Sequence, residues 1–319
     1  MSPPAALRPA GLAPYAVLAV APLCWAGNIV LARGVADLIP PVAFAFFRWT
    51  LASLLLLPFA LRQAARDRHE IRRGWKRLAV LALLGISGFN TLLYAAVHTT
   101  TAINGALLQT SMPAVIVLLS LLLHRERVSR AQLAGVLLCI AGAAGIVLRG
   151  DPRRLAQFDL VPGDLLMAAA VVLYALYSVL LRRRPPLHPL SLLAATFAFG
   201  AAALFPAFLA ECALYGAPAL DGRVAASVLY VALFPSIVAY FCWNRGIDRL
   251  GPNRAGLFIN LIPVFAALLS VALLGERVQG FHLAGLALIA GGMILFYRRG
   301  GPERRTRREP AATGPPARE

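Results

Sequence analysis

Arg48 is the residue of this sequence whose position most needs a chemical explanation. It is the only formal charge well inside a long apolar stretch, the window 41–60. Counted from Pro41 at 1.5 Å per residue it would lie about 10 Å deep in a spanning helix, where a cation is costly. Two roles fit such a residue: contact with the carboxylate of a substrate, or a structural contact with backbone carbonyls of a neighbouring helix.

Amide and aromatic side chains recur on shared helix faces in the other apolar stretches. Trp25 and Asn28 are three residues apart, and Asn90 and Tyr94 are four apart, so each pair lies on one face of a helix. Polar groups inside a membrane need partners and often mark a substrate path. The sequence therefore predicts a substrate cavity lined by these residues and Arg48, together with Gln109, Tyr174, Tyr177, Trp243 and Asn260.

Each of these candidates has an alternative role. For Asn28, Asn90 and Asn260, an interhelical hydrogen bond explains a buried amide as well as a cavity does. For Trp243 and Tyr240, near the end of an apolar stretch, an interfacial aromatic belt is the favoured interpretation.

Pro113 and Pro263 occupy matching positions inside the apolar windows 104–123 and 255–273. Proline removes a backbone hydrogen bond and kinks a helix. The two prolines are therefore candidate hinges for opening and closing the cavity, with a static kink as the alternative.

Small residues cluster in the windows 131–148 and 280–297. Glycine lets helices approach closely in a membrane. We expect close packing, either within the chain or at the face of a homodimer, from Gly135, Gly142, Gly145, Gly285 and Gly292.

Catalytic and cofactor-binding patterns are missing from the sequence. There is no H-E-x-x-H, G-x-S-x-G or phosphate-binding G-x-x-x-x-G-K-[ST], and the four cysteines lack metal-ligand spacing. Glu126 and Glu276 sit at helix ends beside arginine and read as caps. Because no acid lies at mid-membrane, facilitated diffusion or exchange without a cofactor is expected, and an enzyme is not.

Composition places the chain in a membrane. Of its 319 residues 59% are hydrophobic and 14% charged, with mean hydropathy +0.72, whereas soluble domains run near a quarter charged. The net charge of +17 lies in short clusters between apolar runs without interleaved aromatics, which argues against nucleic-acid binding.

Ten windows are long and apolar enough to span a bilayer. They are residues 13–32, 41–60, 78–97, 104–123, 131–148, 162–181, 189–210, 224–243, 255–273 and 280–297. With the N-terminus inside, 24 Lys and Arg fall on the inner side and 6 on the outer. Because cytoplasmic loops are enriched in Lys and Arg, this predicts an inner-membrane protein with both termini cytoplasmic.

The chain also repeats itself at an offset of 150 residues. Thirteen of the 30 positions 113–142 are identical to 263–292, including the prolines and the triplets E-R-V and L-A-G. Five helices separate the copies, so the halves must be inverted, as in many secondary transporters. The expected organisation is an N-terminal segment 1–12, repeats 13–148 and 162–297, an outer linker 149–161 and a basic tail 298–319 against the lipid headgroups.

The motifs "CWAGNIVLAR" (24–33), "FAFFRW" (44–49), "GERV" and "LAGLALIAGG" (283–292) resemble the EamA-type branch of the drug/metabolite transporter superfamily. The stretch 243–278 is especially similar to the second repeat of that family, and the resemblance covers residues 13–297. It implies an all-α polytopic carrier of ten transmembrane helices in two inverted five-helix repeats. It also favours the structural role for Arg48, which lies in one of the shared motifs.

The predicted function is export of small metabolites, amino acids first, by alternating access about a midplane cavity between the repeats. A carrier of nucleosides or of neutral or cationic drugs is the alternative within the same class, and a channel or an intramembrane enzyme are the alternatives outside it. The expected partners are a small-molecule substrate and the lipid bilayer.

Overall fold

The computed structural model of the protein describes residues 13–100, 105, 108–125, 128–153, 161–274 and 279–299, and these form helices and no strand. The first half comprises α1 (Ala13–Val35), α2 (Pro41–Arg66), α3 (Arg68–Ala82), η1 (Leu83–Gly88), α4 (Phe89–Thr99), α6 (Met112–His124) and α7 (Arg130–Val147). The second half comprises α8 (Pro162–Leu180), η3 (Leu181–Arg183), α9 (Pro189–Tyr215), α10 (Gly222–Val231), η4 (Ala232–Val238), α11 (Ala239–Leu250), α12 (Pro252–Gly256), η5 (Leu257–Leu261), α13 (Ile262–Leu274) and α14 (Gly280–Arg299).

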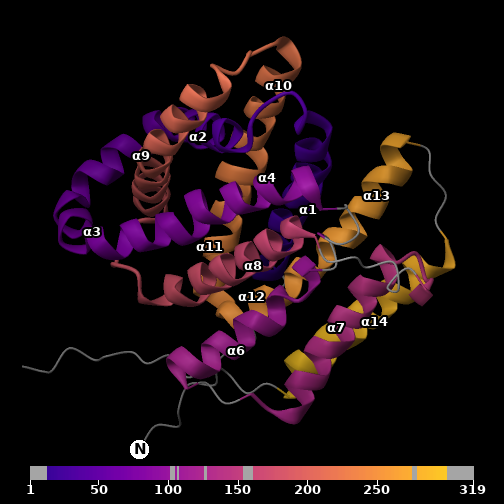
Figure 1. Ribbon diagram of the computed structural model, residues 1–319. Helices are drawn as coiled ribbons and strands as arrows, with labels where there is room; N and C mark the ends of the chain where they lie inside the picture. The colour runs from indigo at the N-terminus through magenta and orange to yellow at the C-terminus, as the bar shows by residue number, and fades with distance from the viewer. Residues whose placement is uncertain are drawn as a thin grey trace, which may run out of the picture.

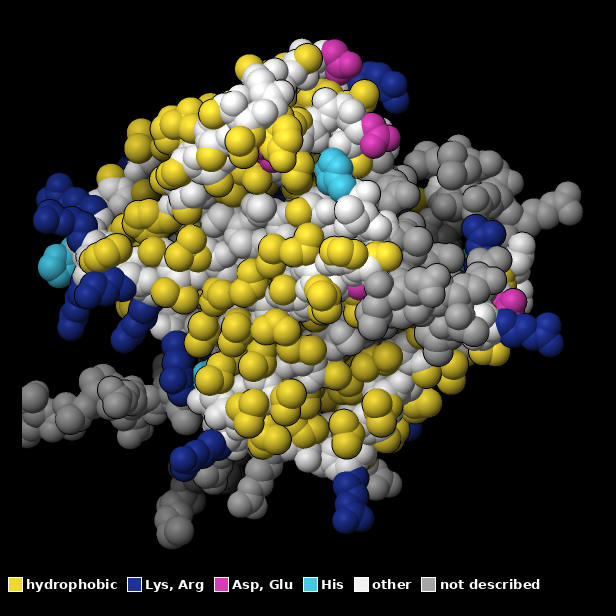
Figure 2. All heavy atoms as spheres, in the orientation of Figure 1, with side chains coloured by type: hydrophobic (Ala, Val, Ile, Leu, Met, Phe, Trp, Pro, Cys, Tyr) yellow, Lys and Arg dark blue, Asp and Glu magenta, His cyan; other side chains and the backbone are white. Residues whose placement is uncertain are grey.

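Seven described helices are long and apolar enough to cross a membrane. They are Pro41–Arg66, Arg68–Thr99, Arg130–Val147, Pro162–Arg183, Pro189–Tyr215, Gly222–Leu250 and Gly280–Arg298, and Leu108–His124 is a shorter apolar helix. Hydrophobic side chains cover much of the visible surface, with Lys and Arg at its margins (Figure 2). The all-helical membrane architecture is thus confirmed. The predicted number of ten spans exceeds these helices, and the caps expected at Glu126 and Glu276 lie outside the described residues.

Contacts between helix ends define two sides of the bundle. On one side the turn after α8 is joined to the end of α11 by Arg184 and Asp248, and the end of α2 meets the start of α9. We call this the Arg-rich side, because Arg66 at the end of α2, Arg183 and Arg184 after α8, and Arg249 near the end of α11 lie there. On the opposite side the end of α4 meets the start of α8, where Thr100 donates a hydrogen bond to Asp164.

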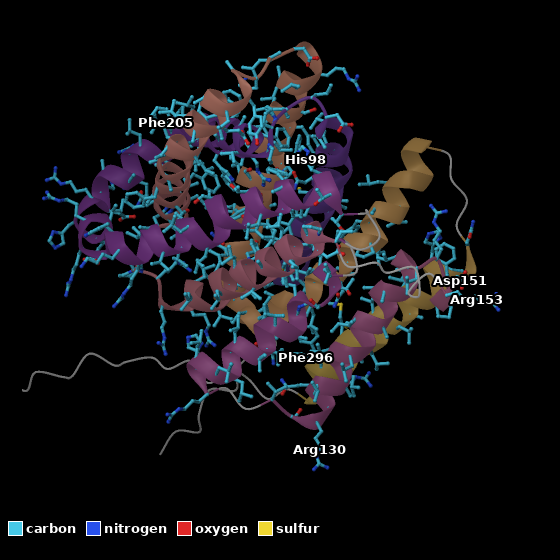
Figure 3. The ribbon with its side chains drawn as sticks, viewed as in Figure 1. His98, Arg130, Asp151, Arg153, Phe205 and Phe296 are labelled. Atoms are coloured by element: carbon cyan, nitrogen blue, oxygen red, sulfur yellow. The ribbon has the colours of Figure 1, made fainter. Side chains whose placement is uncertain are left out.

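The helices α7 and α14 form an antiparallel pair that shows how the two halves are related (Figure 1). A Cβ placed on Gly135 would lie 2.6 Å from the Gly292 oxygen, and one on Gly142 would lie 2.6 Å from the Gly285 oxygen. Gly135 and Gly285 are equivalent positions of the two repeats, and so are Gly142 and Gly292, each pair 150 residues apart. The second contact is therefore the first one with the two helices exchanged. The helices therefore cross about a pseudo-two-fold axis, as inverted repeats require. Figure 3 shows Arg130 at one end of this pair and Asp151 and Arg153 at the other.

Four of the five glycines predicted to mediate close packing thus meet inside this chain. Gly145 does not, since no described heavy atom lies within 4 Å of a Cβ built there. Cys139 and Ile289, which are equivalent positions, touch at the crossing, with the Cys139 Sγ 3.4 Å from the Ile289 oxygen.

A second antiparallel pair, α2 with α9, is fastened at both ends by acids. Glu211, near the end of α9, accepts hydrogen bonds from the backbone N–H groups of Val42 (3.1 Å) and Ala43 (2.6 Å) at the start of α2. Asp67, after the end of α2, accepts one from the His188 N–H (2.9 Å) at the start of α9. Each acid occupies a helix N-terminus, where unpaired N–H groups and the helix dipole favour a carboxylate.

Replacing Glu211 by alanine is expected to destabilise the fold by about 1–2 kcal/mol, because the buried N–H group of Ala43 and the partly buried one of Val42 lose their acceptor. The measurement is thermal unfolding of the detergent-solubilised protein. Asp37→Ala, which removes an exposed carboxylate from the turn before α2, is the control and should leave the midpoint unchanged. Equal midpoints for both variants would contradict the capping role.

Candidate functional site

A cavity lies between the two halves of the chain. Six predicted residues line it: Trp25, Asn28, Arg48, Asn90, Gln109 and Tyr174. The sequence prediction did not include the rest of its wall, which consists of Phe89, Leu93, Met112, Tyr240, Ile259 and Ile262. Both repeats contribute, and no described lining residue is an acid.

Arg48 crosses from α2 into the wall of this cavity and is 1% exposed. Its Nη1 donates to the Asn90 Oδ1 (2.8 Å) and the Tyr94 hydroxyl (2.6 Å), with Asn28 Oδ1 at 3.5 Å. Its Nε donates to the Ser236 hydroxyl (2.7 Å) and its Nη2 to the Pro235 carbonyl (3.2 Å). These partners are all neutral. The guanidinium is thus held by hydrogen bonds from both repeats while its charge stays uncompensated by them.

Two π-helical segments supply carbonyl oxygens to the site. In η1 the Ser87 hydroxyl donates to the Ala82 oxygen five residues earlier (3.3 Å), and in η4 Ser236 does the same to Val231 (2.7 Å). The two bonds are 149 residues apart, so the segments are equivalent. Such bulges free backbone groups from the regular ladder and are frequent at functional sites.

Each segment offers a freed carbonyl to the other repeat. The Pro235 oxygen of η4 accepts from Arg48 and from the Trp25 indole N–H (3.1 Å). The Gly85 oxygen of η1 accepts from the Tyr240 hydroxyl. Pro235 also lacks an N–H, which loosens the local helix pattern. The π-segments therefore bind the repeats together at the cavity.

Aromatic rings close the cavity on its Arg-rich side. The Trp25 ring packs edge-on against Tyr174 (5.6 Å), Tyr240 (6.2 Å) and Trp243 (5.2 Å). Trp243 is 0% and Tyr240 1% exposed, so the interfacial belt favoured for them from the sequence is wrong. Both belong to the protein interior, and their hydroxyl or indole groups have partners there.

Interrupted helices form the remaining wall. Gln109 and Met112 flank a turn at Ser111, and Ile259 and Ile262 flank the junction of the 3₁₀ segment η5 with α13. Pro113 and Pro263 are each the second residue of the helix that follows, α6 and α13. The prolines thus stand at matching breaks, and broken helices at matching positions of two repeats are a mark of transporter binding sites.

Four predicted residues lie outside the cavity wall: Trp243, whose burial is described above, and Tyr94, Tyr177 and Asn260. Tyr94 reaches Arg48 and Asn28 from the α4 side and lines a second, smaller cavity. Tyr177 donates to Asn244 (2.7 Å). Asn260 is fully buried, and among the described residues neither atom of its amide has a partner.

A model of the EamA-like transporter family matches the chain twice, over residues 12–148 and 161–298. This chain belongs to the EamA-like transporter family. It is thus a multi-pass membrane transporter, with the plasma membrane as its expected location, and not an enzyme. The family model therefore occurs as two repeats along the chain.

Curated relatives of this EamA chain include transporters of named and unnamed substrates. The "Uncharacterized transporter YyaM" of Bacillus subtilis is 26% identical over 83% of this chain and 87% of the relative. The "Aromatic amino acid exporter YddG" of Ancylobacter novellus is 27% identical over 85% and 92%. The "Probable terminal-alkyne amino-acid exporter" of Streptantibioticus cattleyicolor is 28% identical over 78% and 83%.

The fold is shared with a solved crystal structure. That structure matches this EamA chain with a TM-score of 0.72 at 24% sequence identity, covering 89% of this chain and 96% of the other.

Some site residues of this EamA chain carried a signal in the sequence and others carried none. Tyr240 lies three residues before Trp243 on one helix face and could have been added by spacing. Pro235 and Ser236 could not, because their roles depend on a π-segment that periodicity does not reveal.

Proposed function

We propose that this chain is a secondary transporter that exports small metabolites, amino acids first among them, by alternating access of the central cavity. In the proposed topology ten segments cross the membrane as two inverted repeats of five, and the Arg-rich side with both termini faces the cytoplasm. The two relatives named as amino-acid exporters support this substrate class.

The observation that carries the proposal is the chemistry of the cavity wall. Arg48 supplies a positive charge with neutral partners, and Asn28 and Gln109 supply amide groups. A buried cation without a counter-charge favours an anionic group nearby. The carboxylate of an amino acid meets that need.

The rest of an amino acid fits the other walls. The rings of Trp25, Tyr174 and Tyr240 line the cavity, and ring faces attract ammonium groups as well as apolar side chains. A cationic drug would instead face the Arg48 charge, and a neutral nucleoside would leave it unpaired. The wall therefore favours zwitterions over both alternatives.

In this proposal Arg48 has two roles at once. Its hydrogen bonds to Asn90, Tyr94 and Ser236 hold α2, α4 and η4 together. The structural role favoured from the sequence was contact with backbone carbonyls, and among these partners the Pro235 oxygen is the one of that kind. Its unneutralised charge attracts the substrate carboxylate into the cavity. The breaks before Pro113 and Pro263 are the proposed hinges, because a helix bends most easily where its ladder is already interrupted.

The test is counterflow into proteoliposomes. Labelled amino acid outside should enter faster and saturably when unlabelled amino acid is preloaded inside, because a carrier returns faster when loaded. Uptake that is linear in concentration and indifferent to preloading would indicate a channel. No uptake with neutral, aromatic and charged amino acids would overturn the substrate class, with nucleosides and drugs next.

A further inference from the structure

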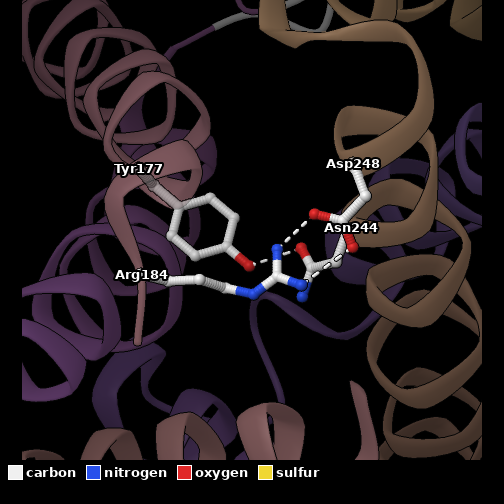
Figure 4. A network of polar contacts seen from close by, with 4 residues as sticks. All are labelled: Tyr177, Arg184, Asn244 and Asp248. Atoms are coloured by element: carbon white, nitrogen blue, oxygen red, sulfur yellow. Dashed lines mark hydrogen bonds and ion pairs between the residues drawn. The ribbon is translucent and has the colours of Figure 1, made fainter. Parts of the chain in front are cut away.

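The aromatic rings that close the cavity on its Arg-rich side are followed, further towards that side, by two layers of polar contacts. These contacts join α8 to α11 (Figure 4). Tyr177, three residues beyond the cavity-lining Tyr174, donates to the Asn244 Oδ1 at 2.7 Å. Arg184, beyond the end of α8, binds Asp248 through both Nη atoms, with Nη2 2.9 Å from Oδ2. These layers lie between the cavity and the surface of the Arg-rich side.

The ion pair is only partly shielded from solvent. The Arg184 side chain is 16% and the Asp248 side chain 30% exposed. Separating a fully buried pair would cost a large free energy, whereas a fully exposed pair would add little stability to the closed state. Partial burial with two parallel hydrogen bonds suits a contact that must close firmly and still open.

The opposite side of the cavity lacks this contact. At the offset of 149 residues that relates the π-segments, the counterparts of Arg184 and Asp248 are Val35 and Thr99. Val35 lines the second cavity, with Val97, His98 and Tyr94. Where the Arg-rich side has an ion pair, the equivalent positions on the opposite side thus hold Val35 and Thr99, and Val35 borders a small second cavity.

We propose that Arg184 and Asp248 form a latch that holds the cavity closed on the Arg-rich side and sets the resting state of the carrier. Movement of α8 away from α11 must break this pair before the cavity can open there. The Tyr177–Asn244 bond and the Trp243–Ser178 bond (3.3 Å) form a second barrier behind it. On the opposite side, Tyr94 separates the central cavity from the second one. The latch rests on the proposed alternating access.

The test measures whether a water-soluble reagent reaches the space between the aromatic rings and the Arg184–Asp248 pair. It needs no knowledge of the substrate. Ser178, which is fully buried on α8, is replaced by cysteine as a reporter. Because this changes the acceptor of the Trp243 bond, every variant is compared with the reporter parent. A membrane-impermeant methanethiosulfonate is applied to right-side-out and to inside-out membrane vesicles, and the labelling rate is measured. The same protein with Ser178 intact gives the background from the four native cysteines.

Asp248→Asn and Arg184→Gln are each expected to raise reporter labelling from the Arg-rich side about fivefold, the factor that a lost ion pair of this kind is worth. The double exchange Arg184→Asp with Asp248→Arg should lower the rate again towards that of the reporter parent. Arg183→Gln is the matched control, since Arg183 is an exposed arginine of the same turn, and it should leave the rate unchanged.

Unchanged labelling in both single variants would overturn the latch. So would a charge exchange that labels as fast as the single variants, because an ion pair restored in the reverse sense would then fail to close the path. An equal rise from both sides would indicate a loosened fold and would also count against it. Failure of amino-acid counterflow leaves this result intact, so the two proposals can fail separately.

Discussion

Replacing Arg48 by glutamine is expected to lower transport at least about 100-fold and to destabilise the fold by about 3–5 kcal/mol. The variant removes the charge that Arg48 brings to the described cavity wall, so the carboxylate of the proposed substrate loses its attraction. It also breaks the hydrogen bonds that reach Asn90, Tyr94, Ser236 and the Pro235 carbonyl. Counterflow measures the first effect and thermal unfolding in detergent the second.

Arg48→Lys separates the two roles. Lysine keeps the charge but has three donors on one nitrogen in place of the guanidinium fork, so it cannot reach partners on α4 and η4 together. We expect Arg48→Lys to show most of the stability loss of Arg48→Gln but a smaller loss of transport.

The position in the second repeat that matches Arg48 is Thr196. Thr196 lies seven residues after the proline that begins α9, as Arg48 lies seven residues after Pro41 in α2. The cation is therefore confined to one repeat, and the cavity has one positive end.

The contrary outcome is equally informative. If Arg48→Gln is folded and transports amino acids at the parental rate, the charge does not act on the substrate. Arg48 would then be a structural residue alone, and the preference of the cavity for carboxylates would have to come from elsewhere in its wall.

The sequence predicted most of the architecture because the signals for it are local or repeated. Apolar windows follow from the thickness of the bilayer, and the 150-residue repeat is visible as identities. Six of the ten candidate residues line one cavity, since polar groups in lipid-spanning segments have few places to go. Mid-membrane polarity thus singled out Arg48 and Asn28, which both line the cavity.

The rest depends on pairings that no local pattern encodes. Arg184 and Asp248 are 64 residues apart, and both looked like ordinary charges at helix ends. The π-segments follow from tertiary contacts around Ser87 and Ser236, which periodicity does not record. Trp243 was misplaced because its distance from the end of an apolar window resembles that of a belt residue, while the packing of α1 and α8 buries it.

Gly292→Leu is expected to destabilise the protein by about 3 kcal/mol or more, whereas Gly291→Leu, one residue away, should be neutral or slightly stabilising. A Cβ on Gly292 would lie 2.6 Å from the Gly135 oxygen and 2.9 Å from the Cys139 nitrogen, and backbone cannot move aside as a side chain can. A Cβ on Gly291 meets no described atom within 4 Å. Thermal unfolding and size-exclusion profiles of the two variants give the comparison.

This pair of variants also decides between the two uses predicted for the glycines. At the α7–α14 crossing, equivalent residues touch one another, so exchanging the conformations of the two repeats leaves that contact unchanged. In the proposed transport cycle the crossing can therefore stay closed while α8 and α11 separate. If Gly292 instead served a homodimer face, Gly292→Leu would lower the assembled mass without lowering the unfolding midpoint of the monomer. A lower midpoint at constant mass is the result that the crossing requires.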